Sequence, residues 1–355
     1  MATLEALVGC DTRNPPRAPA AGGVFAFVDG ALPPGFAREL VDLGDGCVWL
    51  YAWRGTPRVC FNVHLDTVPA DPGWRGDPLG LVVEGERAVG LGACDIKGAA
   101  ACLLTAVARV PGDVGLLFTS DEEAGSSRCI RSFLDRKLCP PRVVVAEPTA
   151  CRAVLEHRGI ATATGSFRGV GGHASSPRAL ADSALHEAVR WAARALAFAE
   201  AAEARRYRSL AGIRFNLGVL AGGQKANMIA AEAELRFGVR PLPDQDPRTL
   251  LSELGALAPD PARVAWTPAF VAPPLPHPAP GTLDRALAFA ADLGLEPAEP
   301  VDFWTEAALF SAAGHDALVY GPGDIAQAHT AGEWVSLSEL ARAEAAYERW
   351  VGGGA

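Results

Sequence analysis

The sequence predicts an α/β protein whose main domain is a mostly parallel sheet flanked by helices, with an α+β unit inserted into it. Short apolar strands alternate with helical segments up to about residue 150, and this alternation resumes near residue 282. The strands are too continuously apolar for a half-exposed sheet, which is typical of parallel sheets covered on both faces. Between them, residues 153–271 show strands, one long helix and further strands. The predicted domains are therefore 1–152 with 272–355, and an inserted domain of 153–271.

Composition limits the kind of partner. The chain has 355 residues, 49% of them hydrophobic and 21% charged, and a net charge of -9. This length suggests two domains, and the acidic balance argues against nucleic acid or an anionic membrane as the main partner. A small-molecule partner is expected instead. Eight cysteines without C-x-x-C spacing, no basic leader and no run of 18 apolar residues favour a reduced, cytoplasmic protein.

Each domain has its own set of expected elements. An Asp-Thr-Arg-Asn-Pro-Pro run comes so early in the chain that any helix before it should be short. The main domain is expected to contain strands at 48–53, 59–63, 114–118, 142–146 and 317–320, and helices at 99–110, 127–138 and 282–293. A capping box at Ser336 and Glu339 predicts the start of a last helix that ends near 351. In the inserted domain we expect strands at 158–167, 213–219, 232–239 and 264–270, and a helix at 181–206.

Polar side chains follow the strands of the main domain. His64 and Asp66 come directly after the strand 59–63, spaced so that they can face the same way. A single histidine in such a place is most often a hydrogen-bonded core residue. With Asp66 beside it, a ligand histidine oriented by a carboxylate becomes the alternative.

Asp95 lies in a glycine-rich turn that enters the helix 99–110. An N-cap is the simple interpretation of an aspartate in this position. The glycines do not follow the G-x-G-x-x-G register, so we exclude a dinucleotide site.

Three consecutive acids, Asp121, Glu122 and Glu123, end the strand 114–118, and Glu147 follows the strand 142–146. A solvated turn would explain one such cluster. Several polar strand ends in one α/β domain instead predict a site, because open parallel sheets bind ligands at the carboxyl ends of their strands.

Convergence of these acids requires positive charge. Two carboxylates about 4 Å apart would repel by roughly 4 kcal/mol at an effective dielectric of about 20. Two histidines, His64 and His329, together with three acids are the ligands that two zinc-type ions require if one carboxylate bridges them.

Several strings of the sequence resemble one known family, and they occur in the family's order over nearly the whole chain. These are HLDTVP (64–69), GACDIKG (92–98), SDEEAG (120–125), AEPT (146–149), GGHASS (171–176), KANMIA (225–230) and QAHTAGE (327–333). They are similar to the motifs of the co-catalytic zinc family that contains aminoacylases, acetylornithine and succinyl-diaminopimelate deacylases, and glutamate carboxypeptidase. The family implies two divalent metal ions, zinc or cobalt.

The resemblance implies a role for each matching residue of the metal site. His64, Asp95 and Glu147 would hold one ion, and Asp95, Glu123 and His329 the other. Glu122 would be the general base, and Asp66 would orient His64. The family also implies a cis peptide bond between Asp95 and Ile96.

The resemblance extends to the inserted domain and to the substrate. The inserted domain would be a ferredoxin-like dimerisation or lid domain, and the protein a homodimer. His173 would stabilise the oxyanion from the partner chain, and Asn227 and Arg240 would bind the substrate carboxylate. For His173 and Arg240 taken alone, a loop hydrogen bond and a surface salt bridge are the simpler interpretations. Thr305 and Glu306, in the string WTEA, are further expected substrate-binding residues.

The implied activity is removal of acetate from an N-acetyl amino acid of arginine biosynthesis. Strings 301–312 and 319–331 are most similar to the acetylornithine deacetylase branch of the family. We expect N-acetyl-L-citrulline as the substrate, with N-acetyl-L-ornithine as the alternative. A dipeptidase or carboxypeptidase on the same scaffold, and a non-catalytic metal-binding homologue, are the other hypotheses. The second is disfavoured because Glu122 and all implied ligands are present.

Overall fold

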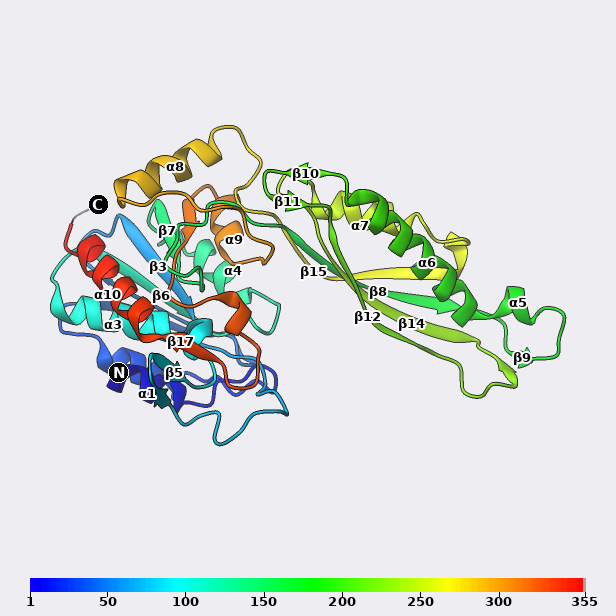
Figure 1. Ribbon diagram of the computed structural model, residues 1–355, viewed down its shortest axis with the longest axis horizontal. Coiled ribbons are helices and arrows are strands. Elements are labelled where there is room, and N and C mark those ends of the chain that lie inside the picture. Colours follow the sequence, from blue (N-terminus) through cyan, green and yellow to red (C-terminus); the bar gives the residue numbers. More distant parts are fainter. Residues whose placement is uncertain (354–355) are drawn as a thin grey trace. The chain divides into compact units, whose positions relative to one another are not determined.

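The computed structural model describes residues 1–353, which divide into two compact units (Figure 1). The first unit contains residues 1–155, 279–298 and the chain from Thr305 onward; the second contains 156–278 and 299–304. The boundaries fall three and seven residues later than the predicted ones. The short segment 299–304, which the sequence assigned to the main domain, belongs to the second unit.

The first unit is built on a six-stranded sheet in the order β1-β2-β6-β3-β7-β16. Strands β6, β3, β7 and β16 run parallel, whereas β1 and β2 are antiparallel additions at one edge. The strands of this sheet are β1 (Ala37–Asp42), β2 (Val48–Arg54), β3 (Val59–His64), β6 (Val114–Thr119), β7 (Arg142–Val145) and β16 (Asp316–Val319). A smaller three-stranded sheet consists of β4 (Val82–Glu84), β5 (Arg87–Val89) and β17 (Trp334–Ser336).

Helices cover both faces of this sheet. One side carries α3 and α10, whose apolar residues share a core with β3 and β6 that includes Phe61, Leu103 and Tyr347. On β2, Trp49 and Tyr51 pack against Phe133 of α4. The helices of this unit are α1 (Ala2–Val8), α2 (Val24–Ala31), α3 (Gly98–Arg109), α4 (Arg128–Asp135), α8 (Thr282–Asp292), α9 (Ala307–Ala312) and α10 (Leu337–Val351), with short turns η1 (Ala93–Lys97) and η3 (Ile325–Gln327).

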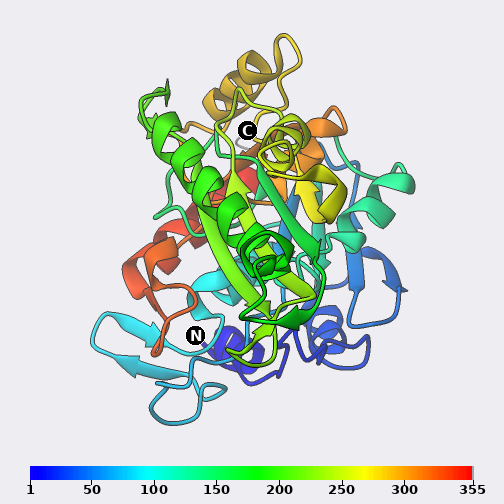
Figure 2. The ribbon, with the colours of Figure 1, turned by 90° about the vertical axis from the view of Figure 1, so that its right-hand side faces the viewer.

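The second unit has a four-stranded antiparallel sheet in the order β12-β14-β8-β15. Helices α6 and α7 cover one face, and Figure 2 shows α6 lying along the strands. Trp191 of α6 is fully buried against Phe237 and Trp266. The elements are β8 (Ile160–Arg168), β9 (Gly172–His173), α5 (Ala179–Asp182), α6 (Ala184–Ala202), β10 (Arg206–Tyr207), β11 (Leu210–Ala211), β12 (Arg214–Gly222), β13 (Met228–Ile229), β14 (Glu232–Arg240), α7 (Pro247–Gly255), η2 (Pro261–Arg263) and β15 (Val264–Ala272).

The predicted fold class is confirmed. The first unit is α/β with a mainly parallel sheet, and the second follows the β-α-β-β-α-β order of ferredoxin-like units in β8, α6, β12, β14, α7 and β15. The helix before the Asp-Thr-Arg-Asn-Pro-Pro run is short, as expected, at seven residues. All eight cysteines are free thiols. In the described chain, every helix is too short or too polar to cross a membrane.

The predicted helix 181–206 is shorter, because α6 ends at Ala202 and Arg206 lies in β10, and the predicted capping box of α10 is wrong. Ser336 does cap α10 by position, but its side chain accepts no hydrogen bond from the first turn of the helix. The Ser336 hydroxyl instead lies 2.9 Å from the hydroxyl of Ser338. Glu339 accepts a hydrogen bond from the N–H of Gly323 at 2.8 Å, so the capping box does not form because its glutamate binds a loop distant in sequence.

Candidate metal centre

The candidate site forms where the parallel strands of the first unit end. β3 ends at His64, β6 is followed by Asp121–Glu123, and β7 is followed by Glu147. Because β3, β6 and β7 run in the same direction, these residues meet at one edge of the sheet. Asp95, in η1, and His329, in the loop after η3, complete the set.

Two groups of possible ligands share one aspartate. In the first, His64 Nε2 lies 3.0 Å from Asp95 Oδ1 and 3.5 Å from Glu147 Oε1. In the second, His329 Nε2 lies 2.9 Å from Glu123 Oε1 and 3.4 Å from Asp95 Oδ2. Within each group one donor atom per residue lies within 4.8 Å of the others. Asp95 thus directs a different oxygen towards each histidine.

The site concentrates negative charge in a buried place. Burial raises the pKa of Glu147 well above its usual range, and burial together with the charge of Glu123 raises the pKa of Glu122 to about 8. Burial alone would raise the pKa of Asp95 as well, but hydrogen bonds with His329 and His64 lower this pKa overall. Imidazole nitrogens and carboxylate oxygens are the ligands of zinc-type ions, and such ions would offset this repulsion. The donor set therefore fits divalent metal ions.

Asp66 lies on the far side of the His64 ring. Its side chain is fully buried, and Oδ1 lies 3.6 Å from His64 Nδ1. The backbone oxygen of Asp66 is closer to the same nitrogen, at 3.1 Å. Asp66 Oδ2 accepts a hydrogen bond from the N–H of Glu123 at 2.9 Å. The aspartate therefore contacts both the His64 ring and the backbone that carries the predicted base and ligand.

Thr305 and Glu306, at the start of α9, are also buried in the first unit. The Glu306 atom Oε1 has no hydrogen-bond partner. Burial and the charges of Asp121 and Glu122 raise the pKa of Glu306 well above its usual range. Glu306 is thus a buried acid near the predicted general base, with one oxygen that has no hydrogen-bond partner among the described residues.

The Asp95 turn has an unusual backbone. The peptide bond between Asp95 and Ile96 is cis, as predicted. Gly92 has φ 77°, and a Cβ there would lie 2.6 Å from Thr67 Cγ2, so the turn requires glycine at this position. Glu333 accepts hydrogen bonds from the N–H groups of Gly92, Cys94 and Asp95. Sequence analysis missed this role, although Glu333 lies in the same string as His329.

A segment near the N-terminus, residues 10–14, binds three of the site loops. Asn14 Nδ2 donates to the carbonyl of Ser120 at 2.8 Å, and Lys97 Nζ donates to the carbonyl of Cys10 at 3.0 Å. The backbone of Thr67 exchanges hydrogen bonds with Thr12 and Asn14. Neither Asn14 nor Lys97 was predicted as functional, because hydrogen bonds between distant segments leave no periodic pattern.

In the second unit the structure brings His173 and Asn227 together. β9 and β13 form a short ribbon in which His173 pairs with Met228, and the carbonyl of Asn227 accepts a hydrogen bond from the N–H of Ala174. Both side chains belong to exposed residues. His173 Nδ1 lies 2.7 Å from the Ser175 hydroxyl, so the simple loop hydrogen bond considered above is present.

Arg240 lies elsewhere in the second unit. It is the last residue of β14, whereas Asn227 precedes the first residue of that strand. Nine residues of strand span about 27 Å. Asn227 and Arg240 of one chain are therefore too far apart to bind the same carboxylate. Arg240 instead lines a cavity of about 230 Å³ with Thr162 and Asn216.

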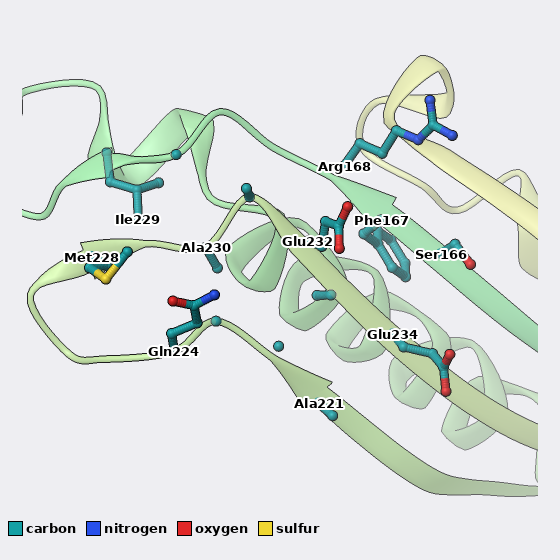
Figure 3. A pocket seen from close by; sticks show the side chains of 15 residues that line it. Ser166, Phe167, Arg168, Ala221, Gln224, Met228, Ile229, Ala230, Glu232 and Glu234 are labelled. Carbon is teal, nitrogen blue, oxygen red and sulfur yellow. The ribbon is translucent and has the colours of Figure 1, made fainter.

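A wider groove of about 770 Å³ lies beside the ribbon, between the ends of β12, β14 and β8 (Figure 3). Its lining combines small and apolar residues with Arg168, Gln224, Glu232 and Glu234, and contains neither histidine nor cysteine. The groove therefore lacks the histidines that both ligand groups of the first unit contain, in spite of its size.

The fold and the site together define a metal-dependent hydrolase with an inserted ferredoxin-like unit. The chain belongs to peptidase family M20/M25/M40, whose model matches residues 60–352. Membership of this family of metallopeptidases implies divalent metal ions. The match includes every residue of the two candidate ligand groups.

Similar proteins cover almost the full chain. An N-acetyl-L-citrulline deacetylase of Xanthomonas campestris pv. campestris is 51% identical over 99% of this chain and 96% of its own length. An acetylornithine deacetylase of Myxococcus xanthus is 32% identical over the same shares. Among solved structures, a tripeptidase from Staphylococcus aureus has a TM-score of 0.77 at 16% identity and covers 99% of this chain and 97% of its own. The last comparison shows the fold alone.

Proposed function

We propose that this protein is a dizinc deacetylase that hydrolyses N-acetyl-L-citrulline to L-citrulline and acetate, in the cytoplasm, as a step of arginine biosynthesis. The observation that carries the hydrolytic part is the pair of ligand groups that share Asp95, with Glu122 beside them. The choice of substrate is supported by the 51% identity to a protein of that name, which extends over nearly both chains.

In this proposal His64, Asp95 and Glu147 hold one zinc ion, and Asp95, Glu123 and His329 hold the second. The bound ions would act as Lewis acids that stabilise negative charge on the amide oxygen and make the attacking water more acidic. Asp66 orients His64 through Nδ1, the ring nitrogen that faces away from the proposed metal.

Glu122 is the general base of the proposed reaction. Its carboxylate takes a proton from the attacking water and gives it to the nitrogen of the departing amine, so acetate and a free amine are the products. Glu122 belongs to neither candidate ligand group, which leaves its carboxylate for proton transfer.

The second unit would contribute to substrate binding from two chains. Arg240 lies at one end of β14, and the pair His173 and Asn227 lies near the other end. One substrate can therefore contact all three residues only if Arg240 comes from one subunit and the pair from another. We propose that Arg240 of one chain and Asn227 of its partner bind the substrate carboxylate. His173 of the partner donates a hydrogen bond to the oxyanion.

The edge strand β12 is the proposed dimer contact. It has a partner on one side only, and Val219 and Leu220 are 39% and 43% exposed. The other edge, β15, is interrupted at Pro268, which makes it a poor template for pairing. On the neighbouring helix α6, Val189 and Leu196 add exposed apolar surface. A second copy that pairs antiparallel along β12 would cover these side chains.

N-acetyl-L-ornithine is the second candidate substrate. The acetylornithine deacetylase of Myxococcus xanthus supports it, and so does the buried acid Glu306, whose free Oε1 could accept a hydrogen bond from the ornithine ammonium group. The ureido group of citrulline is neutral and needs both donors and acceptors. Binding sites with buried polar groups can reject a mismatched substrate by several orders of magnitude.

The test is to measure kcat/KM for both acetylated amino acids with the same zinc loading, together with acetate release from other N-acetyl amino acids and hydrolysis of dipeptides. We expect acetylcitrulline to be the best substrate. A higher value for acetylornithine would refute the citrulline assignment and leave the deacetylase intact. Preferential hydrolysis of dipeptides would refute both.

A further inference from the structure

Glu333 is a buried acid that the proposed reaction does not use. Only 2% of the residue is exposed. Its Oε1 accepts hydrogen bonds from the N–H groups of Cys94 and Asp95, both at 2.9 Å, and its Oε2 accepts one from Gly92 at 3.0 Å. The backbone carbonyl of Glu333 accepts a fourth hydrogen bond, from Gly90. One residue thus binds four N–H groups of the segment 90–95.

One of these hydrogen bonds comes from Asp95, the residue that the two ligand groups share. Asp95 has φ -118° and ψ 89°, and both Asp95 and Ile96 depart from helical backbone angles within η1. The N–H groups of Gly92, Cys94 and Asp95 converge on a single carboxylate because Gly92 has a left-handed backbone, with φ 77°.

Glu333 also joins this turn to the loop that carries His329. It stands four residues after His329 and directly before β17, whose first residue, Trp334, pairs with Val89 of β5. His329 has φ 59°, a backbone conformation that few residues adopt, so this residue needs support from neighbouring structure. The Glu333 side chain therefore connects the backbones of two segments that supply atoms to the second ligand group.

We propose that Glu333 is a positioning residue that sets the placement of Asp95 relative to His329 and so the affinity of both metal sites. The inference rests on the proposed function, since Asp95 must be a metal ligand. Residues that hold ligands in place typically contribute about 10- to 100-fold to metal affinity. Hydrogen bonds from N–H groups to a charged carboxylate are also stronger than neutral ones.

The deciding variant is Glu333→Gln, which keeps the size of the side chain but replaces one acceptor oxygen with a donor. That donor would face an N–H group of the turn. We expect zinc to dissociate about 10-fold faster or more into a chromogenic chelator, and the visible spectrum of the cobalt-loaded protein to change because ligand geometry changes. In Glu333→Asp, which shortens the side chain, the effect should be at least as large. This variant decides the matter if the glutamine variant does not fold.

The matched control is Glu187→Gln in the second unit. Glu187 is also buried, at 3% exposure, and its Oε1 accepts the N–H of Asp260 at 2.8 Å. This variant should keep wild-type zinc release and the wild-type cobalt spectrum even if its melting temperature falls. Zinc release and a cobalt spectrum unchanged in folded Glu333→Gln or Glu333→Asp would overturn the positioning role. Failure of the wild-type protein to bind zinc would instead overturn the proposed function, and this inference with it.

Discussion

Glu122 and Glu123 are neighbours in sequence, yet their side chains have different surroundings. Glu123 Oε1 contacts His329 Nε2 at 2.9 Å and belongs to a ligand group. Glu122 belongs to neither group, but the charges of Glu123 and Asp95 are close enough to raise its pKa. The turn after β6 therefore places a candidate proton carrier and a candidate ligand at consecutive positions.

This separation predicts opposite effects of two adjacent substitutions. Glu122→Ala should lower kcat by about 10²- to 10⁴-fold, the usual contribution of a general base, while close to two zinc ions per chain remain. Glu123→Ala, its matched control, should lose metal as well as activity. Elemental analysis alongside kinetics distinguishes the two. Loss of zinc from Glu122→Ala would place this residue among the ligands.

The two histidines make metal binding depend on pH. Burial would lower the pKa of His64, but the charge of Glu147 and contacts with Asp66 and Asp95 raise it well above its usual range. Hydrogen bonds to Asp95 and Glu123 raise the pKa of His329 to about 11. These shifts favour the protonated form of both rings in the metal-free protein, and a bound metal ion would have to displace these protons.

Zinc binding should therefore release protons, and zinc affinity should rise with pH up to the pKa of the histidines. Calorimetry in buffers of different ionisation enthalpy measures the number of protons released. A zinc affinity that is constant between pH 6 and pH 9 would contradict this expectation. His186→Ala, which removes an exposed histidine of α6, should release as many protons as the wild type.

At the scale of elements, residues 10–14 connect three loops of the candidate site through hydrogen bonds. Asn14→Ala would leave the buried carbonyl of Ser120 without its amide donor, which costs about 1–3 kcal/mol. We expect a lower melting temperature and a decrease in kcat, because Ser120 precedes the acidic turn 121–123. Ser252→Ala, at an exposed position of α7 in the second unit, should change neither by as much. Differential scanning calorimetry and kinetics on both variants provide the comparison.

Elements with a local pattern were predictable from the sequence. The parallel strands and their polar ends were found because apolar runs followed at once by His64, Asp121 or Glu147 are visible in a short window. The convergence of these ends followed from the rule that parallel strands share one carboxyl edge. The assignment of ligands within the cluster came from resemblance to a family and not from the pattern itself.

Contacts between distant segments were not predictable in this way. The Glu333 carboxylate and the Asp95 turn are 238 residues apart, and no local signal joins them. Glu339 had the spacing of a capping box but binds Gly323 instead, because tertiary contacts competed with the local motif. The distance between Asn227 and Arg240 depends on the direction of β14, which a list of matched motifs does not contain.

For the whole molecule, the proposed sharing of residues between subunits can be tested by mixing inactive chains. In a heterodimer of Glu122→Ala and His173→Ala chains, one site would combine an intact Glu122 with an intact His173 from the partner. Activity should return to as much as half of the wild-type value per dimer. Each homodimer alone is the control and should stay inactive. Verified heterodimers without activity would mean that His173 does not act across the subunit contact.

The length of β14 has a consequence for assembly. If Arg240 of one chain and Asn227 of the other hold the same carboxylate, the substrate is a bridge between subunits. Binding and dimerisation are then thermodynamically linked, so substrate tightens the dimer to the same extent that dimerisation tightens substrate binding. Activity per chain would fall on dilution and recover when the substrate concentration is raised. The fraction of dimer, and with it the activity, would then depend on the substrate concentration.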